Sequence, residues 1–128
     1  MNDDERRAAG RATRSEVLGT AYVARSEANQ NDFTAEWQDF ITRYAWGEIW
    51  NRPGLDRRTR SFMNLAMLVA LGRDDEFQLH VRAAFNNGLS RDDIKEALLH
   101  AAVYCGVPAA NHGFKLAQEV FHAMDAAS

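Results

Sequence analysis

Apolar residues recur along this chain at three- and four-residue intervals, and the alternation of apolar and polar residues that marks a β-strand is nearly absent. Only two prolines, Pro53 and Pro108, interrupt the 128 residues. Proline is excluded from helix interiors, so long stretches of the chain remain free to be helical. The pattern therefore predicts an all-α fold.

Length and composition limit the class of protein. With 128 residues and 46% hydrophobic content, we predict a single globular domain over residues 1–128, with an N-terminal helix and arm (1–31) and a helical core (32–125). The net charge of −3 and the lack of a long basic tract make nucleic acid an unexpected partner. The charged N-terminus has no apolar signal core, and no run of 18 apolar residues exists, so we expect no membrane contact and a cytoplasmic location.

The first half of the chain is polar at its start and aromatic at its end. A charge-rich helix is predicted from Asn2 to about Leu18, and residues 22–32 are ambiguous, with an arm across another subunit as one possibility. Residues 33–50 contain all three tryptophans at largely helical spacing, which suits a core or a subunit interface. Gly47 inside this segment indicates a bend or a close approach by a ligand.

The second half begins with a turn at residues 52–54, followed by a helix over residues 56–72 that is apolar nearly all round in its second part. We expect this helix to be the most buried one. Ser90 and Asp93 have capping-box spacing for the next helix, whose buried face is predicted to include Cys105. Pro108 then stands where the last helix can begin.

A short helix is predicted over residues 73–88, with Asp74 or Asp75 as its cap. Glu76 and His80 are four residues apart, so both side chains lie on one face of this helix. Asn87 returns to the same stripe, and together these groups could form the floor of a polar pocket. The competing interpretation is a solvated helical ion pair of little functional meaning.

Other kinds of site have weaker support. The four histidines form no metal-binding motif and there is no cysteine pair, so we predict neither a metal nor another cofactor. A nucleophilic pair of Cys105 with His80 or His100 stays possible, although a single cysteine in an alanine-rich helix is more often inert. The corner at residues 106–111 could offer backbone N–H groups to an anion, or could simply be a tight turn.

Two stretches carry a resemblance to a known family. LGRDDEFQLHVRAAFNNGLSRDDIKEALLHAAVYCGVPAANHGFKLA and the more distinctive WGEIWNRPGLDRRTRS resemble the carboxymuconolactone decarboxylase family. The resemblance covers roughly residues 10–122. Related alkylhydroperoxidases carry Cys-x-x-Cys followed by a histidine, but Arg73 and Glu76 occupy the two cysteine positions here, with His80 in the histidine position. The resemblance thus excludes the thiol peroxidase reaction.

The resemblance implies an alkylhydroperoxidase-like bundle of about six helices around a helical hairpin, assembled as a homotrimer or homohexamer. It also implies cofactor-independent loss of CO2 from 4-carboxymuconolactone, a dicarboxylate lactone, giving 3-oxoadipate enol-lactone in protocatechuate catabolism (the β-ketoadipate pathway). The alternative is a non-redox member that binds a small acid without decarboxylating it.

For that reaction we expect His80 to donate a proton or contact the oxyanion, and Glu76 to orient its imidazole or keep it charged. Arginine is the natural anchor for the carboxylates, and Arg60 is favoured because it lies nearest the apolar part of its helix. The remaining candidates for substrate binding are Arg57, Arg52, Trp46, Asn87, Tyr104 and Asn111.

Overall fold

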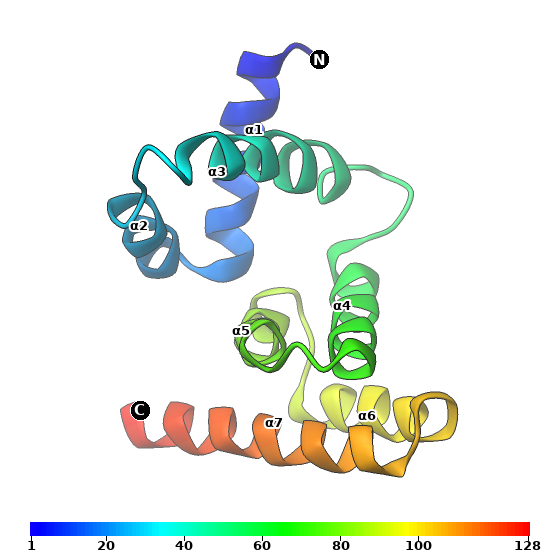
Figure 1. Ribbon diagram of the computed structural model, residues 1–128. Helices are drawn as coiled ribbons and strands as arrows, with labels where there is room; N and C mark the ends of the chain where they lie inside the picture. Colours follow the sequence, from blue (N-terminus) through cyan, green and yellow to red (C-terminus); the bar gives the residue numbers. More distant parts are fainter. The chain divides into compact units, whose positions relative to one another are not determined.

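The computed structural model describes residues 1–128 and is helical throughout, which confirms the all-α prediction (Figure 1). It contains seven α-helices and one π-helix, somewhat more than the expected six. The chain divides into two compact units, Met1–Asp56 and Arg57–Ser128, which are described separately. None of the helices combines the length and the apolar character needed to cross a bilayer.

The first unit consists of α1 (Asp3–Leu18), α2 (Thr20–Ala28), α3 (Ala35–Ile41) and the π-helix η1 (Thr42–Ile49). Helix α3 continues directly into η1, and this long helix crosses α1 (Figure 1). The segment that was ambiguous in the sequence is therefore helical through most of its length. Whether it also reaches another subunit stays a prediction.

Two glycines explain how closely α1 approaches η1. A Cβ atom on Gly10 would overlap the carbonyl oxygen of Thr42, and one on Gly47 would overlap the carbonyl oxygen of Arg6. Any side chain at either position would push the two backbones apart. Gly47 thus permits the close approach of helix α1, whereas the sequence interpretation was a bend or a close approach by a ligand.

The aromatic residues of the first unit fall into two groups. Trp46 is buried and stacks on Trp50, with ring centroids 5.1 Å apart. Trp37, Phe40 and Tyr44 are exposed and contact one another in sequence along the long helix, at centroid distances of 5.9 and 5.4 Å. Only the first group contributes to the interior, so the second forms an apolar surface.

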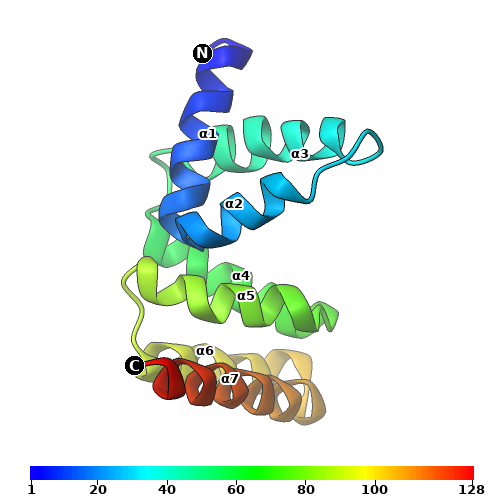
Figure 2. The ribbon, with the colours of Figure 1, turned by 90° about the vertical axis from the view of Figure 1, so that its left-hand side faces the viewer.

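The second unit contains α4 (Arg57–Leu71), α5 (Asp74–Asn86), α6 (Arg91–Cys105) and α7 (Val107–Ala127). Helices α6 and α7 form a hairpin, and α4 and α5 pack on one side of it (Figure 2). The buried side chains of all four helices meet in one apolar core. Its large members are Leu65, Val69, Phe77, Val81, Leu89, Ile94, Leu98, Leu116 and Val120.

The helix boundaries of this unit follow the sequence signals in most places. The Ser90 hydroxyl accepts a hydrogen bond from the Asp93 amide at 3.1 Å, and the Asp93 carboxylate accepts one from the Ser90 amide at 2.9 Å, which confirms the capping box. Pro108 lies in the first turn of α7, as predicted. The predicted cap of α5 was wrong, because Arg73 is its N-cap residue and makes no capping hydrogen bond.

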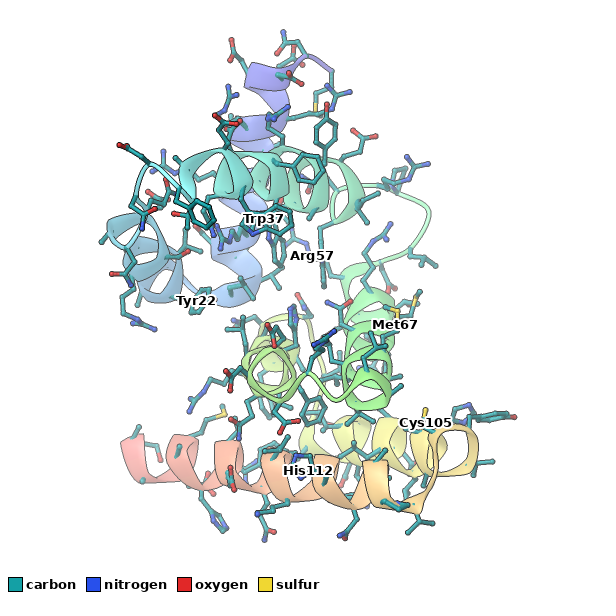
Figure 3. The ribbon with its side chains drawn as sticks, viewed as in Figure 1. Tyr22, Trp37, Arg57, Met67, Cys105 and His112 are labelled. Atoms are coloured by element: carbon teal, nitrogen blue, oxygen red, sulfur yellow. The ribbon has the colours of Figure 1, made fainter.

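Two burial predictions were also wrong. Cys105 is exposed at the end of α6, and Met67 is exposed on α4, on the side away from α5 (Figure 3). Helix α4 buries only the stripe that carries Leu65 and Val69, because a helix in a four-helix unit meets its neighbours on one side. A helix that is apolar on all sides is fully buried in the monomer only when neighbouring elements cover every side.

Candidate functional site

Helices α4 and α5 bring two polar side chains together inside the second unit. The side-chain nitrogen of Asn64 (Nδ2) on α4 lies 3.4 Å from the ring nitrogen Nδ1 of His80 on α5, and this contact is partly buried. Apolar residues on the same two helices, among them Leu65 and Phe77, hold them against the core. The helix pair therefore presents an amide and an imidazole to each other.

The spacing along each helix shows which other residues share this face. On α4, Arg57, Arg60 and Ser61 precede Asn64 by seven, four and three residues, so they lie on the same stripe. This stripe carries two of the arginines that were expected to bind carboxylates.

On α5, Glu76 lies one turn before His80 and Asn87 lies two turns after it, at the C-cap of the helix. Ala83 and Ala84 are buried between His80 and Asn87. The expected pocket floor of Glu76, His80 and Asn87 thus lies on the helix that meets the arginine-bearing stripe of α4.

The stripe of α4 and the stripe of α5 both contain buried polar atoms that have no hydrogen-bond partner in the protein. The Ser61 hydroxyl and both polar atoms of the Asn87 side chain are buried without a hydrogen-bond partner. Leaving such a group unpaired costs about 1–3 kcal/mol, so polar groups without partners are uncommon in protein interiors. The Ser61 hydroxyl and the Asn87 amide are therefore candidates for hydrogen bonds to a ligand or a water molecule.

Burial sets the charge of His80. It lowers the pKa of His80 from 6.5 to about 4, and the negative charge of Glu76 opposes this effect only in part. The imidazole is therefore neutral at pH 7, which contradicts the expectation that Glu76 keeps it charged. The contact with the Asn64 amide nitrogen fits the tautomer in which Nδ1 of His80 accepts and the ring proton is on Nε2.

A third arginine of α4 has a structural role that the sequence did not indicate. Arg58 donates to both carboxylate oxygens of Asp93 at 2.9 and 3.0 Å and to the carbonyl oxygen of Gly88 at 2.9 Å. These bonds hold the pKa of the Asp93 carboxyl well below its usual range. Arg58 thus connects α4 to the segment that follows Asn87.

Four further residues predicted to bind substrate do not belong to α4 or α5. Trp46 and Arg52 belong to the first unit, where Trp46 is buried against Trp50 and Arg52 forms an ion pair with Glu48 at 3.5 Å. Tyr104 is 77% exposed at the end of α6, and Asn111 is exposed near the start of α7. Tyr104 and Asn111 are therefore exposed, unlike the partly buried contact between Asn64 and His80.

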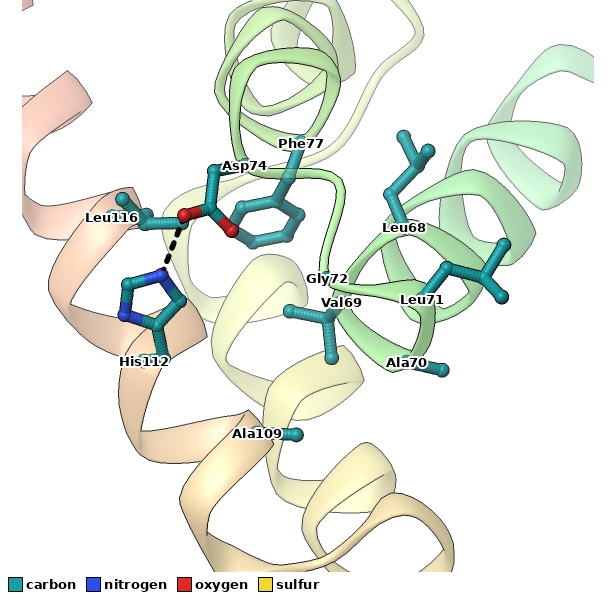
Figure 4. A pocket seen from close by; sticks show the side chains of 10 residues that line it. All are labelled: Leu68, Val69, Ala70, Leu71, Gly72, Asp74, Phe77, Ala109, His112 and Leu116. Carbon is teal, nitrogen blue, oxygen red and sulfur yellow. Dashed lines mark hydrogen bonds and ion pairs between the residues drawn. The ribbon is translucent and has the colours of Figure 1, made fainter.

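A second feature of this unit is a hollow of about 230 Å³ between the end of α4 and helices α5 and α7 (Figure 4). Its wall includes Phe77 and Leu116, and an ion pair lies beside them, with His112 Nε2 2.8 Å from Asp74 Oδ2. Both residues of the pair are about half exposed. The interaction joins α5 to α7 across the hollow.

Sequence reasoning missed Asn64 and Ser61. Both are polar residues inside an otherwise apolar helix, and Asn64 follows Arg60 by four residues. That spacing was visible in the sequence. The burial of Ser61, and the contact of Asn64 with His80, were visible only in the structure.

Comparison with known proteins gives related findings. The sequence model of the carboxymuconolactone decarboxylase family matches residues 35–119. A 4-carboxymuconolactone decarboxylase of Acinetobacter baylyi is 52% identical over 121 residues, which cover 94% of this chain and 90% of that protein. Nitrosuccinic acid decarboxylase npaB of Metarhizium robertsii is 42% identical over 115 residues, covering 90% of this chain and 80% of the relative.

Proposed function

The chain belongs to the carboxymuconolactone decarboxylase family, and we propose that it converts 4-carboxymuconolactone to 3-oxoadipate enol-lactone and CO2 without a cofactor. Support comes from the Acinetobacter baylyi relative, which is named for this activity and aligns with nearly the whole chain. The partly buried contact of Asn64 with a neutral His80 is the structural observation on which the proposed mechanism depends.

The substrate itself can accept the electrons that decarboxylation releases. Its leaving carboxylate is attached to a saturated ring carbon. The ring double bond connects this carbon to the lactone carbonyl. When the carbon–carbon bond breaks, CO2 departs and the electron pair moves onto the carbonyl oxygen, giving a furan-like dienolate. Protonation of the carbon next to the carbonyl then gives the enol-lactone. The protein must bind a dianion, stabilise the oxyanion and provide for this proton.

The second relative supports the same type of chemistry. Nitrosuccinic acid, the substrate in that relative's name, is also a dicarboxylic acid, and its nitro group can accept the electron pair that departing CO2 leaves behind. Both named substrates therefore combine two carboxyl groups with an internal electron acceptor. A site that binds carboxylates and stabilises a developing oxyanion serves either substrate.

Arginines of α4 are suited to hold the carboxylates. Arg60 and Arg57 lie on the stripe that also carries Asn64, and a guanidinium binds a carboxylate through two parallel hydrogen bonds. We assign Arg60 to one carboxylate because it lies one turn from Asn64. Ser61 and Asn87 then donate to, or accept from, the remaining polar atoms of the lactone.

His80 acts on the oxyanion as a neutral donor. In this mechanism Nδ1 of His80 accepts from Asn64, and the Nε2–H donates to the carbonyl oxygen of the substrate. A neutral imidazole donates a hydrogen bond without first taking up a proton, and a buried donor is already oriented when negative charge develops. Asn64 in this arrangement stabilises the tautomer whose proton is on Nε2. The negative charge of Glu76 raises the pKa of the ring, against the effect of burial.

An ultraviolet assay with 4-carboxymuconolactone, in the absence of added metal and with a chelator present, tests the activity. We expect conversion to the enol-lactone, with kcat reduced about 100- to 1000-fold in His80→Ala, the range for loss of one oxyanion donor. Asn64→Asp, which offers no amide proton to Nδ1, should lower kcat while preserving size. Saturable binding of the lactone without CO2 release would instead identify a small-acid-binding protein, the alternative function.

We also propose that the chain forms a homotrimer or homohexamer. Exposed aromatic residues of the first unit support this, since Phe33 is 93% exposed and the surface formed by Trp37, Phe40 and Tyr44 continues from it. Sedimentation at several protein concentrations tests the proposal, and Trp37→Glu should shift the distribution toward the monomer. A wild-type protein that sediments only as a monomer would contradict it. The cytoplasmic location stays a prediction.

A further inference from the structure

Arg14 on α1 is a buried arginine that has no carboxylate partner. Only 6% of the residue is exposed, and its guanidinium donates to two neutral acceptors, the Gln38 side-chain oxygen at 3.2 Å and the Ser26 hydroxyl at 3.3 Å. Its Nε is buried without an acceptor. A buried charge is normally paired, because removing it from water is costly. Arg14 therefore differs from the other arginines of α1.

The neighbouring charges do not neutralise Arg14. It lines a hollow of about 290 Å³ within the first unit, together with Arg7 and Arg11, which lie seven and three residues earlier on the same stripe of α1. Arg7 forms an ion pair with Asp39, and Arg11 forms one with Glu27. Arg7 also pairs with Asp4, and Asp39 also pairs with Arg43. Of the three arginines in this wall, only Arg14 donates to neutral acceptors alone.

We propose that this hollow binds a small organic monocarboxylate, with Arg14 as its anchor. A guanidinium carries five N–H groups, and two of those on Arg14 are used by Gln38 and Ser26. The remaining N–H groups, among them the Nε–H that has no acceptor, can therefore donate to a carboxylate. The side-chain NH2 of Gln38, whose oxygen already accepts from Arg14, supplies a further donor in the same wall.

The charges of the hollow favour a monoanion. One negative charge matches the single arginine that has no carboxylate partner, whereas the second charge of a phosphate would meet the nearby carboxylates of Glu27 and Asp39. At about 30 Å³ per water molecule, the volume has room for on the order of ten non-hydrogen atoms. Val23 is buried in the wall and offers an apolar contact for the body of the acid.

Titration with benzoate tests the proposal directly. Benzyl alcohol serves as the neutral analogue and inorganic phosphate as the competing anion, all at constant ionic strength. The readouts are calorimetry and the side-chain nitrogen resonances of the arginines. We expect saturable binding of benzoate that moves the Arg14 resonance, no saturable binding of benzyl alcohol, and phosphate binding at least tenfold weaker. Tighter binding of phosphate than of benzoate would overturn the assignment to a carboxylate.

Two substitutions separate binding from a purely structural role of Arg14. Gln38→Glu preserves the size of the side chain and places a carboxylate on Arg14 from within the protein, so benzoate affinity should fall at least tenfold while the folded state is retained. Arg14→Lys keeps the charge but loses the paired donors, and should also weaken benzoate. Arg25→Gln, on an exposed residue of α2 outside this hollow, is the matched control and should change the affinity less than twofold.

The outcomes are distinct. Loss of benzoate binding in Gln38→Glu with retention in Arg25→Gln supports the site. Wild-type affinity in a folded Gln38→Glu protein, or no saturable benzoate binding by the wild type, would show that Arg14 only ties α1 to α2 and α3 through its hydrogen bonds and would overturn the proposal. Neither readout depends on turnover, so the result stands whether or not the decarboxylase assay succeeds.

Discussion

The buried neutral His80 should make the protein less stable as the pH falls, by an amount that follows from its pKa. The pKa is about 4 in the folded protein and near 6.5 for an unperturbed histidine, so the unfolded chain binds more protons between these values. The free energy of unfolding therefore decreases as the pH falls through this window, and above about pH 6.5 the residue makes no pH-dependent contribution. The full loss is about 3 kcal/mol below pH 4, and about 2 kcal/mol is already lost at pH 5.

Urea unfolding of the wild type and of His80→Gln, at intervals from pH 7.5 to pH 4.5, measures this contribution. Glutamine cannot take up the proton, so the wild type should lose about 2 kcal/mol relative to the variant between pH 7.5 and pH 5. Titration of other groups cancels in the difference between the two proteins. His122→Gln, which replaces an exposed imidazole of α7 by the same residue, is the matched control.

A direct titration of the His80 ring by NMR gives the second measurement. A resonance that does not titrate above about pH 5 supports the neutral imidazole and the role that we propose for it. If the ring titrates near pH 6.5, or if the difference between wild type and His80→Gln does not vary with pH, the reasoning is refuted.

Three further predictions concern close contacts and charge. Gly10→Ala would place a methyl group against the carbonyl oxygen of Thr42, so the first unit should be destabilised or lose its α1–η1 packing, measured by circular dichroism and thermal unfolding. Gly113→Ala would place a Cβ 2.6 Å from Val69 Cγ2, and overpacking of about 1–3 kcal/mol should outweigh the gain of about 0.5–1 kcal/mol in helix propensity, measured by urea unfolding. Hydrogen bonds from Arg58 lower the pKa of the Asp93 carboxyl in the folded state. The stabilisation by this carboxylate is therefore present at neutral pH and is lost as the pH falls below the usual pKa of an aspartate. Asp93→Asn should destabilise the protein at pH 7 and progressively less in acid. Urea midpoints that are unchanged in these variants would contradict each prediction.

Local signals in the sequence were most reliable where one residue decides a backbone hydrogen bond. The capping box of Ser90 and Asp93, and Pro108 in the first turn of α7, formed as predicted. The predicted cap at Asp74 or Asp75 did not form. Several acidic residues at a helix start leave the choice of cap open, and the geometry of the preceding turn decides among them.

Burial was less predictable, because it depends on which neighbours cover a helix. Met67 and Cys105 belong to apolar helices and yet are exposed, whereas Arg14 and Asn87 are polar and buried. Periodicity identifies an apolar face, but it does not say how wide a face the neighbouring helices will cover. The unpaired arginine of α1 could not be recognised from charge alone, since three arginines on that helix share one stripe and only one is buried without a carboxylate partner.

The sequence by itself determined the helical class, the family, and the stripe of Glu76, His80 and Asn87, because helical spacing and recognisable motifs are local properties of the chain. Only the tertiary structure decided the protonation of His80 and its partner. Asn64 lies sixteen residues from His80 along the chain and meets it only when α4 packs against α5. The same packing removes water from the imidazole, and desolvation, which no local pattern encodes, makes that imidazole neutral.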